Sequence, residues 1–154
     1  MATTWILVAD QARARLFSLD PTDGAAEGGL REIAGFVNPE GRITGRPAGA
    51  PRPPRTQESV GGARHAIEPR SDLHDIAARR FAGELTEELE RGRVDHLYDT
   101  LVLVAPPRFL GQLKHSLGRQ LQGHLVAEIA KDLSKAEPAA IRRALPRQGL
   151  AAPH

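Results

Sequence analysis

The sequence predicts an α/β protein with a mixed five-stranded sheet and helices on both faces. Two apolar runs, Thr4–Ala9 and residues 101–105, have no polar alternation, which is typical of central strands covered on both faces. The later strands alternate with helical patterns, and such crossovers require parallel pairing. A chain of 154 residues is enough for one domain with a single core.

The first three predicted strands follow one another without a helix between them. After a short turn at Asp10, Arg13–Leu19 alternates in polarity, which indicates a more peripheral strand. The third strand is predicted at Leu30–Val37, where Gly35 indicates a bulge or an edge position. Three consecutive strands of this kind can form an antiparallel meander.

The strongest helical pattern begins after Asp72, which is the predicted N-cap. Gly83 inside this helix indicates a close approach to a neighbouring element, and Gly92 is the predicted stop. The predicted buried stripe has helical spacing and consists of Leu73, Ile76, Ala77, Phe81, Leu85 and Leu89.

A strand passes directly into a helix at Ala105-Pro106-Pro107-Arg108. Pro106 ends the strand because a central ladder needs its N–H, whereas Pro107 suits the first helical turn. Since ligands of α/β sheets bind outside the carboxyl ends of the strands, Arg108 is a candidate for recognising an anion. The helix is predicted to extend to Leu117.

The remaining elements are a strand and a short helix. Alternation of Leu125, Ala127 and Ile129 predicts the fifth strand, and a last helix is predicted to begin near Glu137 with Pro138 in first position. We therefore expect one domain over residues 1–146 and a frayed tail over residues 147–154.

Glycine, proline and arginine dominate residues 39–69, where no apolar periodicity remains. A flexible loop is predicted here, and loops of this length are usually functional or disordered. Its first half carries no acidic residue between positions 41 and 55 but has four arginines: Arg42, Arg46, Arg52 and Arg55.

Composition excludes several classes of site. The chain has no cysteine, so disulfides and thiolate chemistry are absent. Its histidines lack the helical pairing of zinc sites, and no phosphate-cradling or dinucleotide motif occurs, so no metal and no cofactor is expected. No segment has the export signal or the apolar length of a membrane span, which predicts a cytoplasmic protein.

Five segments in order resemble the bacterial host-attachment protein family, described as proteins required for attachment to host cells: residues 5–10, 12–17, 81–85, 101–111 and 128–133. The family is related to the middle domain of archaeal and eukaryotic peptide-chain release factors. The resemblance implies a ribonuclease-H-like sheet with strand order 3-2-1-4-5, in which the second strand is antiparallel.

In those release factors, a Gly-Gly-Gln loop between the third strand and the first helix enters the ribosomal peptidyl-transferase centre. The corresponding interval here contains Gly61-Gly62-Ala63-Arg64. Because Ala63 replaces the glutamine, the resemblance does not extend to peptide release. The two glycines would still allow the backbone to approach RNA closely.

These observations favour a non-catalytic, RNA- or ribosome-associated binding module. Arginine donates bidentately to phosphate, and interspersed glycine lets a loop follow a nucleic-acid backbone. A solubilising linker is the alternative interpretation of the same loop. The candidate binding residues are Arg42, Arg46, Arg52, Arg55, Gly61, Gly62, Arg64 and Arg108.

Two other functions remain open at the level of sequence. A metal-dependent nuclease of ribonuclease-H-like fold would use Asp10 at a strand end with Glu84 or Glu87 on the next helix, although a third carboxylate is missing. A regulatory or scaffolding protein would affect attachment indirectly. Fold analogy alone is a poor basis for assigning the nuclease.

Overall fold

The computed structural model describes residues 3–20, 29–39 and 67–146 and confirms the five-stranded mixed sheet. The strands are β1 (Thr4–Ala9), β2 (Arg13–Leu19), β3 (Leu30–Val37), β4 (Thr100–Val104) and β5 (Leu125–Ile129). The helices are α2 (Ile67–Val94), α3 (Pro107–Ser116), α4 (Arg119–Gln122) and α5 (Pro138–Ala144).

The strand order is β3-β2-β1-β4-β5, as a ribonuclease-H-like sheet requires. β2 is antiparallel to both β1 and β3, whereas β4 is parallel to β1 and to β5. The carboxyl ends of β1, β4 and β5 therefore meet at one edge of the sheet. This edge carries the candidate functional site.

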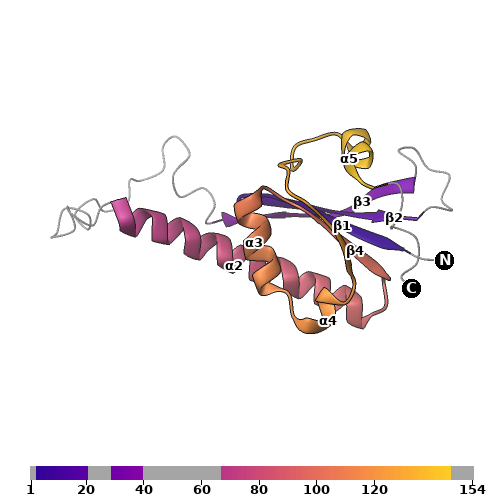
Figure 1. Cartoon of the computed structure of the whole chain (residues 1–154), viewed down its shortest axis with the longest axis horizontal. Helices are drawn as coiled ribbons and strands as arrows, with labels where there is room; N and C mark the ends of the chain where they lie inside the picture. Colours follow the sequence, from indigo (N-terminus) through magenta and orange to yellow (C-terminus); the bar gives the residue numbers. More distant parts are fainter. Residues whose placement is uncertain (1–2, 21–28, 40–66, 147–154) are drawn as a thin grey trace.

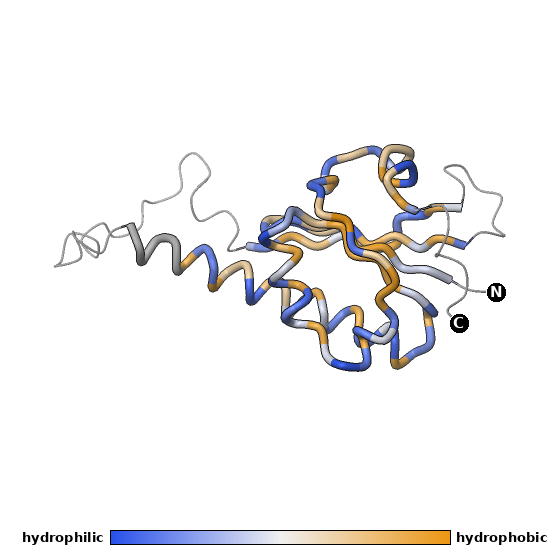
Figure 2. Tube along the Cα trace, viewed as in Figure 1, coloured by the Kyte–Doolittle hydropathy of each residue, from blue (hydrophilic) through white to orange (hydrophobic). Residues whose placement is uncertain are grey.

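Helices cover both faces of the sheet, as the sequence predicts. α2, α3 and α4 lie on one face and α5 lies on the other (Figure 1). Hydrophobic residues concentrate in the central strands, whereas hydrophobic and hydrophilic residues alternate along the helices (Figure 2). Successive side chains of β1 point into the two resulting hydrophobic cores: Leu7 packs in the core beneath α2, and Ile6 packs in the core beneath α5. This explains why β1 shows no polar alternation.

β3 is an edge strand, and its bulge lies two residues before Gly35. Leu16 pairs with Ala34 but Phe17 pairs with Glu32, so Ile33 has no partner in the ladder. Ile33 is exposed at the edge of the sheet. The extra residue of the bulge does not have to be a glycine, because the side chain of Ile33 extends into solvent.

The predicted start of α2 at Asp72 is wrong, because the helix begins at Ile67. The last three positions of the predicted 39–69 loop therefore belong to α2. Pro69 is compatible with this start because the first helical turn leaves its N–H groups without intrahelical acceptors. The early turns extend past the end of the sheet (Figure 1).

Only the later part of the predicted stripe on α2 is buried. Leu73 and Ile76 are exposed, because the part of the helix that carries them lies beside the end of the sheet. The buried members are Ala77, Phe81, Leu85 and Leu89.

The structure corrects the roles of both glycines in α2. A Cβ at Gly83 would meet nothing within 4 Å, whereas a Cβ at Gly92 would lie 2.5 Å from two ring atoms of Trp5. Gly92 is thus the close-approach position, and the helix continues past it. The stop is a Schellman motif with His96 at φ 58°, in which Leu97 N donates to Gly92 O.

Helices α3 and α5 begin where the sequence predicts. α3 begins at Pro107 and buries Phe109, Leu110 and Leu113. α5 begins at Pro138 after Glu137, as predicted. The short helix α4 was not predicted, and it buries Leu121 against the α2 side of the sheet.

Candidate functional site

A cavity of about 520 Å³ opens at the carboxyl ends of β1 and β4. Asp10 follows β1, Pro106 follows β4 and Asp132 follows β5. β1 has β2 as its neighbour on one side and β4 on the other, so the strand order runs in opposite directions from β1. The cavity therefore lies at a topological switch point, the position where α/β sheets bind ligands.

Asp10 is fixed by three hydrogen bonds. Its Oδ1 accepts the backbone N–H groups of Ala12 at 2.7 Å and Arg13 at 2.9 Å, which closes the turn between β1 and β2. Its Oδ2 lies 2.8 Å from the hydroxyl of Ser134. The carboxylate is thus held rigidly at the cavity wall.

Ser134 joins Asp10 to Asp132. Its hydroxyl is 2.8 Å from Oδ2 of Asp10 and 2.8 Å from Oδ1 of Asp132, and the residue is buried. The backbone N–H of Ser134 also donates to Asp132 Oδ1 at 3.2 Å. These contacts attach the segment between β5 and α5 to the end of β1.

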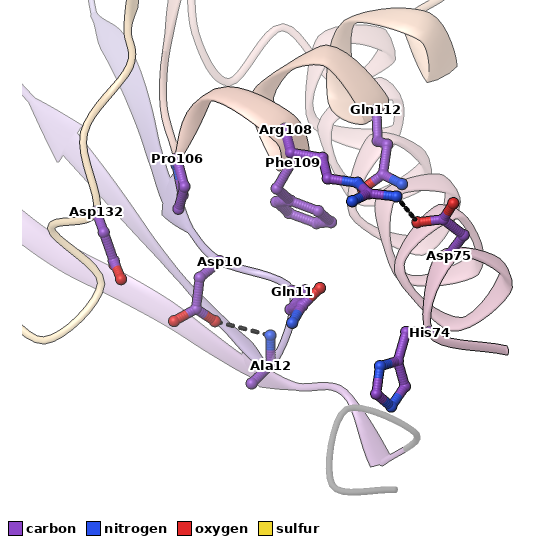
Figure 3. Close-up of a pocket in the computed structure, with 10 residues that line it drawn as sticks. All are labelled: Asp10, Gln11, Ala12, His74, Asp75, Pro106, Arg108, Phe109, Gln112 and Asp132. Carbon is purple, nitrogen blue, oxygen red and sulfur yellow. Dashed lines mark hydrogen bonds and ion pairs between the residues drawn. The ribbon is translucent and has the colours of Figure 1, made fainter. Parts of the chain in front are cut away.

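Arg108 lies on the opposite side of the cavity from Asp10 and Asp132 (Figure 3). Its guanidinium donates to Asp75 Oδ1 at 2.7 Å, although 76% of its side chain is exposed. An anion would therefore share Arg108 with Asp75. The geometry permits a supporting role for Arg108 in anion binding.

His74 of α2 also lines the cavity. Its Nε2 is buried and makes no hydrogen bond within the part of the chain that the structure describes. In the Nδ1-protonated tautomer, this nitrogen is an acceptor without a donor.

The chain leaves β3 beside this cavity, just before the arginine-rich segment begins. Asn38 N donates to Ala12 O at 2.9 Å, and Asn38 Nδ2 donates to Gln11 O at 2.9 Å. Gln11 and Ala12 both line the cavity. The candidates in the segment itself lie outside the described residues: Arg42, Arg46, Arg52, Arg55, Gly61, Gly62 and Arg64.

The acidic candidates are not brought together. Glu84 and Glu87 are exposed on α2, and the α2 residues that line the cavity with Asp10 are His74 and Asp75. Glu84 is nine positions beyond Asp75, roughly 13 Å along a helix. Over residues 3–20, 29–39 and 73–146, no three His, Asp or Glu side chains form a group that could hold a metal ion.

The sequence did not predict that His74 lines the cavity or that Ser134 contacts Asp10 and Asp132. His74 lies inside the predicted helix, where a single histidine gives no signal of a site. Ser134 follows β5 by five positions, and only the fold brings it to Asp10, 124 positions earlier. One signal was available, because Asp132 follows β5 much as Asp10 follows β1.

A model of the family described as "Protein required for attachment to host cells" matches residues 5–145. The chain belongs to this host-attachment family. The match spans β1 through the end of α5, so it includes every residue of the cavity wall. A comparison with curated proteins found no match.

Among solved structures, the chain is similar to an archaeal translation termination factor. The similarity covers 92% of this chain at 10% identity, with a TM-score of 0.42. The chain spans 37% of the length of that factor. Within the described residues, no helix has both the length and the apolar character needed to cross a membrane.

Proposed function

We propose that this host-attachment family protein is a non-catalytic RNA-binding module that acts in the cytoplasm, with RNA of the ribosome as its natural partner. In this proposal, a single domain over residues 1–146 presents the arginine-rich segment to the RNA backbone. The supporting observation is that positions 41 to 55 contain four arginines and no acidic residue. Planar guanidinium groups bind phosphate bidentately.

The anchoring of this segment supports the proposal. Asn38 makes two hydrogen bonds to the turn that follows β1, immediately before the segment begins. The segment therefore begins at the same end of the sheet as the exposed Arg108. A phosphate bound by the segment could also reach Arg108, in competition with Asp75.

A non-catalytic role agrees with the chemistry of the described site. Asp10 is occupied by three hydrogen bonds, and Glu84 and Glu87 lie elsewhere on α2. The segment contains Ala63 where release factors have a glutamine, so the proposed contact with RNA carries no peptide release.

The test is a titration of fluorescently labelled, unstructured 20-nucleotide RNA at several salt concentrations. Four phosphate contacts on a single strand predict a slope of about −3 in log K against log salt. Replacing the four arginines by glutamine should reduce affinity by about tenfold or more and remove most of this slope. The variant combines Arg42→Gln, Arg46→Gln, Arg52→Gln and Arg55→Gln.

A matched control loses the same charge from exposed arginines outside this segment. It should bind RNA within about threefold of the wild type, because charge loss away from the contact acts only through screened, long-range attraction. Equal losses of affinity in both variants would contradict a role for the segment. The control combines Arg79→Gln, Arg91→Gln, Arg119→Gln and Arg143→Gln.

A further inference from the structure

The outer edge of the sheet at β3 is apolar and exposed. β3 is the first strand in the sheet order, so within the described residues no strand pairs with its outer side. Residues 33–37, which we call the β3 edge segment, carry no charge. The side chains of Ile33 and Val37 in this segment are 43% and 60% exposed. An open strand is a template for pairing with another strand, and proteins commonly protect such an edge with charges.

The charges near this edge lie outside the β3 edge segment. Arg31 and Glu32 precede the bulge at Ile33. The opposite edge strand, β5, has a charge within the strand itself, because Glu128 pairs with Lys114 at 3.0 Å. Of the two edges, the β3 edge segment is therefore the better suited to pairing.

The backbone of the β3 edge segment directs hydrogen-bonding groups outward. Asn38 N donates to Ala12 O at 2.9 Å, so the backbone of residue 38 faces the β2 side. Hydrogen-bonded and non-hydrogen-bonded residues alternate along an antiparallel ladder, so the N–H and C=O groups of Val37 and Gly35 face away from β2. An added strand would meet a donor and an acceptor at both positions.

The length of this edge favours a second copy of the chain as the partner. The extra residue Ile33 interrupts the ladder at one end, and Pro39 has no N–H to donate at the other. Gly35 is the middle residue of the β3 edge segment. Antiparallel pairing of two copies around a two-fold axis at Gly35 would use the whole segment and then stop, which gives a closed dimer.

This register is self-complementary. Ile33 of one copy lies opposite Val37 of the other, so the exposed apolar side chains cover each other, and Gly35 lies opposite itself. Registers centred nearer the start of β3 place Arg31 or Glu32 opposite the same residue of the second copy. Like charges directly opposite each other are destabilising.

We propose that two copies of this chain pair antiparallel through their β3 edge segments, with the two-fold axis at Gly35. The two five-stranded sheets then form one continuous sheet. The proposal does not depend on RNA binding by the arginine-rich segment.

Charge substitutions at Gly35 test the dimer by analytical ultracentrifugation over a concentration series. A Cβ at this position would lie 3.9 Å from Ala14 O, an ordinary contact, so a larger side chain fits the single copy. The wild type should dimerise as its concentration rises. Gly35→Lys and Gly35→Glu should each associate at least about tenfold more weakly, because like charges meet at the axis. An equimolar mixture of the two variants should recover the dimer, which a mere folding defect would not do.

Cysteine cross-linking tests the register. The chain has no cysteine, so Gly35→Cys adds one to each copy. Directly opposite residues of a hydrogen-bonded antiparallel pair have Cα atoms about 5.5 Å apart, within disulfide range, so oxidation should link this variant. The matched control Val37→Cys should stay unlinked, because its two cysteines would lie four positions apart along the strands, roughly 13 Å.

Four outcomes would overturn the proposal: a wild type that stays monomeric up to about 1 mM, a Gly35→Lys dimer as stable as that of the wild type, no dimer in the mixture, or equal cross-linking of the two cysteine variants. The first outcome would leave the edge to a strand of another protein. The variant lacking the four loop arginines should dimerise like the wild type while losing RNA affinity, which separates this proposal from the proposed function.

Discussion

The two ends of the β1–β4 pair are built in contrasting ways. At the amino end, the ring of Trp5 stacks on Tyr98 with centroids 4.5 Å apart, and the hydroxyls of Thr4 and Thr100 are 2.7 Å apart. At the carboxyl end, the same two strands open on a cavity bordered by Asp10 and Arg108. We call these the closed end and the open end.

This contrast assigns stability of the fold to the closed end and ligand binding to the open end. At the closed end, the rings and the hydroxyls are buried in contact with one another, so substitutions there should act on folding. At the open end, charged groups face a cavity, so substitutions there should act on ligands. The predictions below test this division, starting with the largest expected effect.

Replacing Trp5 by alanine should have the largest effect. The side chain is almost fully buried against Tyr98 and Gly92, so its loss leaves a cavity at the closed end. We expect a loss of about 3–5 kcal/mol in the free energy of unfolding. Urea denaturation measures it, and a loss below about 1 kcal/mol would show that the closed end does not stabilise the fold.

Gly92→Ala tests the close approach inside α2. The new Cβ would lie 2.5 Å from two ring atoms of Trp5 and 3.2 Å from Tyr98, so the rings must shift. We expect a destabilisation of about 1–3 kcal/mol despite the better helix propensity of alanine.

Gly83→Ala is the matched control on the same helix, because its Cβ would meet nothing within 4 Å. It should stabilise the protein by about 0.5–1 kcal/mol. Thermal unfolding of both variants gives the comparison. The same sign of change in both would contradict the packing described for Gly92.

Tyr98 makes the closed end sensitive to alkaline pH. Burial raises the pKa of its phenol well above the ordinary value, and its hydroxyl donates to Leu89 O at 2.7 Å. The unfolded tyrosine ionises near pH 10, about its ordinary value, so the folded state favours the neutral form. Stability contributed by the neutral phenol is present below that pH and is lost as the pH rises above it.

Tyr98→Phe should therefore cost about 1 kcal/mol at neutral pH, from the lost hydrogen bond, and should flatten the decline in stability above about pH 10. Urea denaturation at pH 7 and at alkaline pH, on both proteins, provides the check. An unchanged alkaline decline in the variant would assign that decline to other groups.

Arg108→Ala should have the smallest effect on folding. Its ion pair with Asp75 is largely exposed, so the free energy of unfolding should change by less than about 0.5 kcal/mol. In the RNA titration, affinity should fall by roughly two- to threefold, consistent with one supporting contact. A large loss of stability would place Arg108 among the residues that hold the fold together.

The sequence predicted most of the fold because local patterns and tertiary packing agree there. Residues 5–9 and 101–105 are apolar throughout because they contact both cores. Pro138 begins α5 where its missing N–H costs nothing. The strand order came from the family resemblance. The stop of α2 was missed because His96, which is not a glycine, takes the left-handed conformation.

The site was less predictable than the fold. Asp10 and Arg108 follow from the rule that ligands bind beyond strand ends. The contact between Asp10 and Ser134 does not, because it joins positions far apart in the sequence through the path of the segment after β5. The pairing of Arg108 with Asp75 likewise depends on how α2 packs beside α3.

The most direct test of the proposed function is sedimentation with ribosomes. The wild type should pellet with ribosomes at low salt and be released at high salt, and the variant lacking Arg42, Arg46, Arg52 and Arg55 should stay in the supernatant at both. The variant should keep the thermal stability of the wild type. Absence of the folded wild type from every ribosomal fraction at low salt would contradict the proposal.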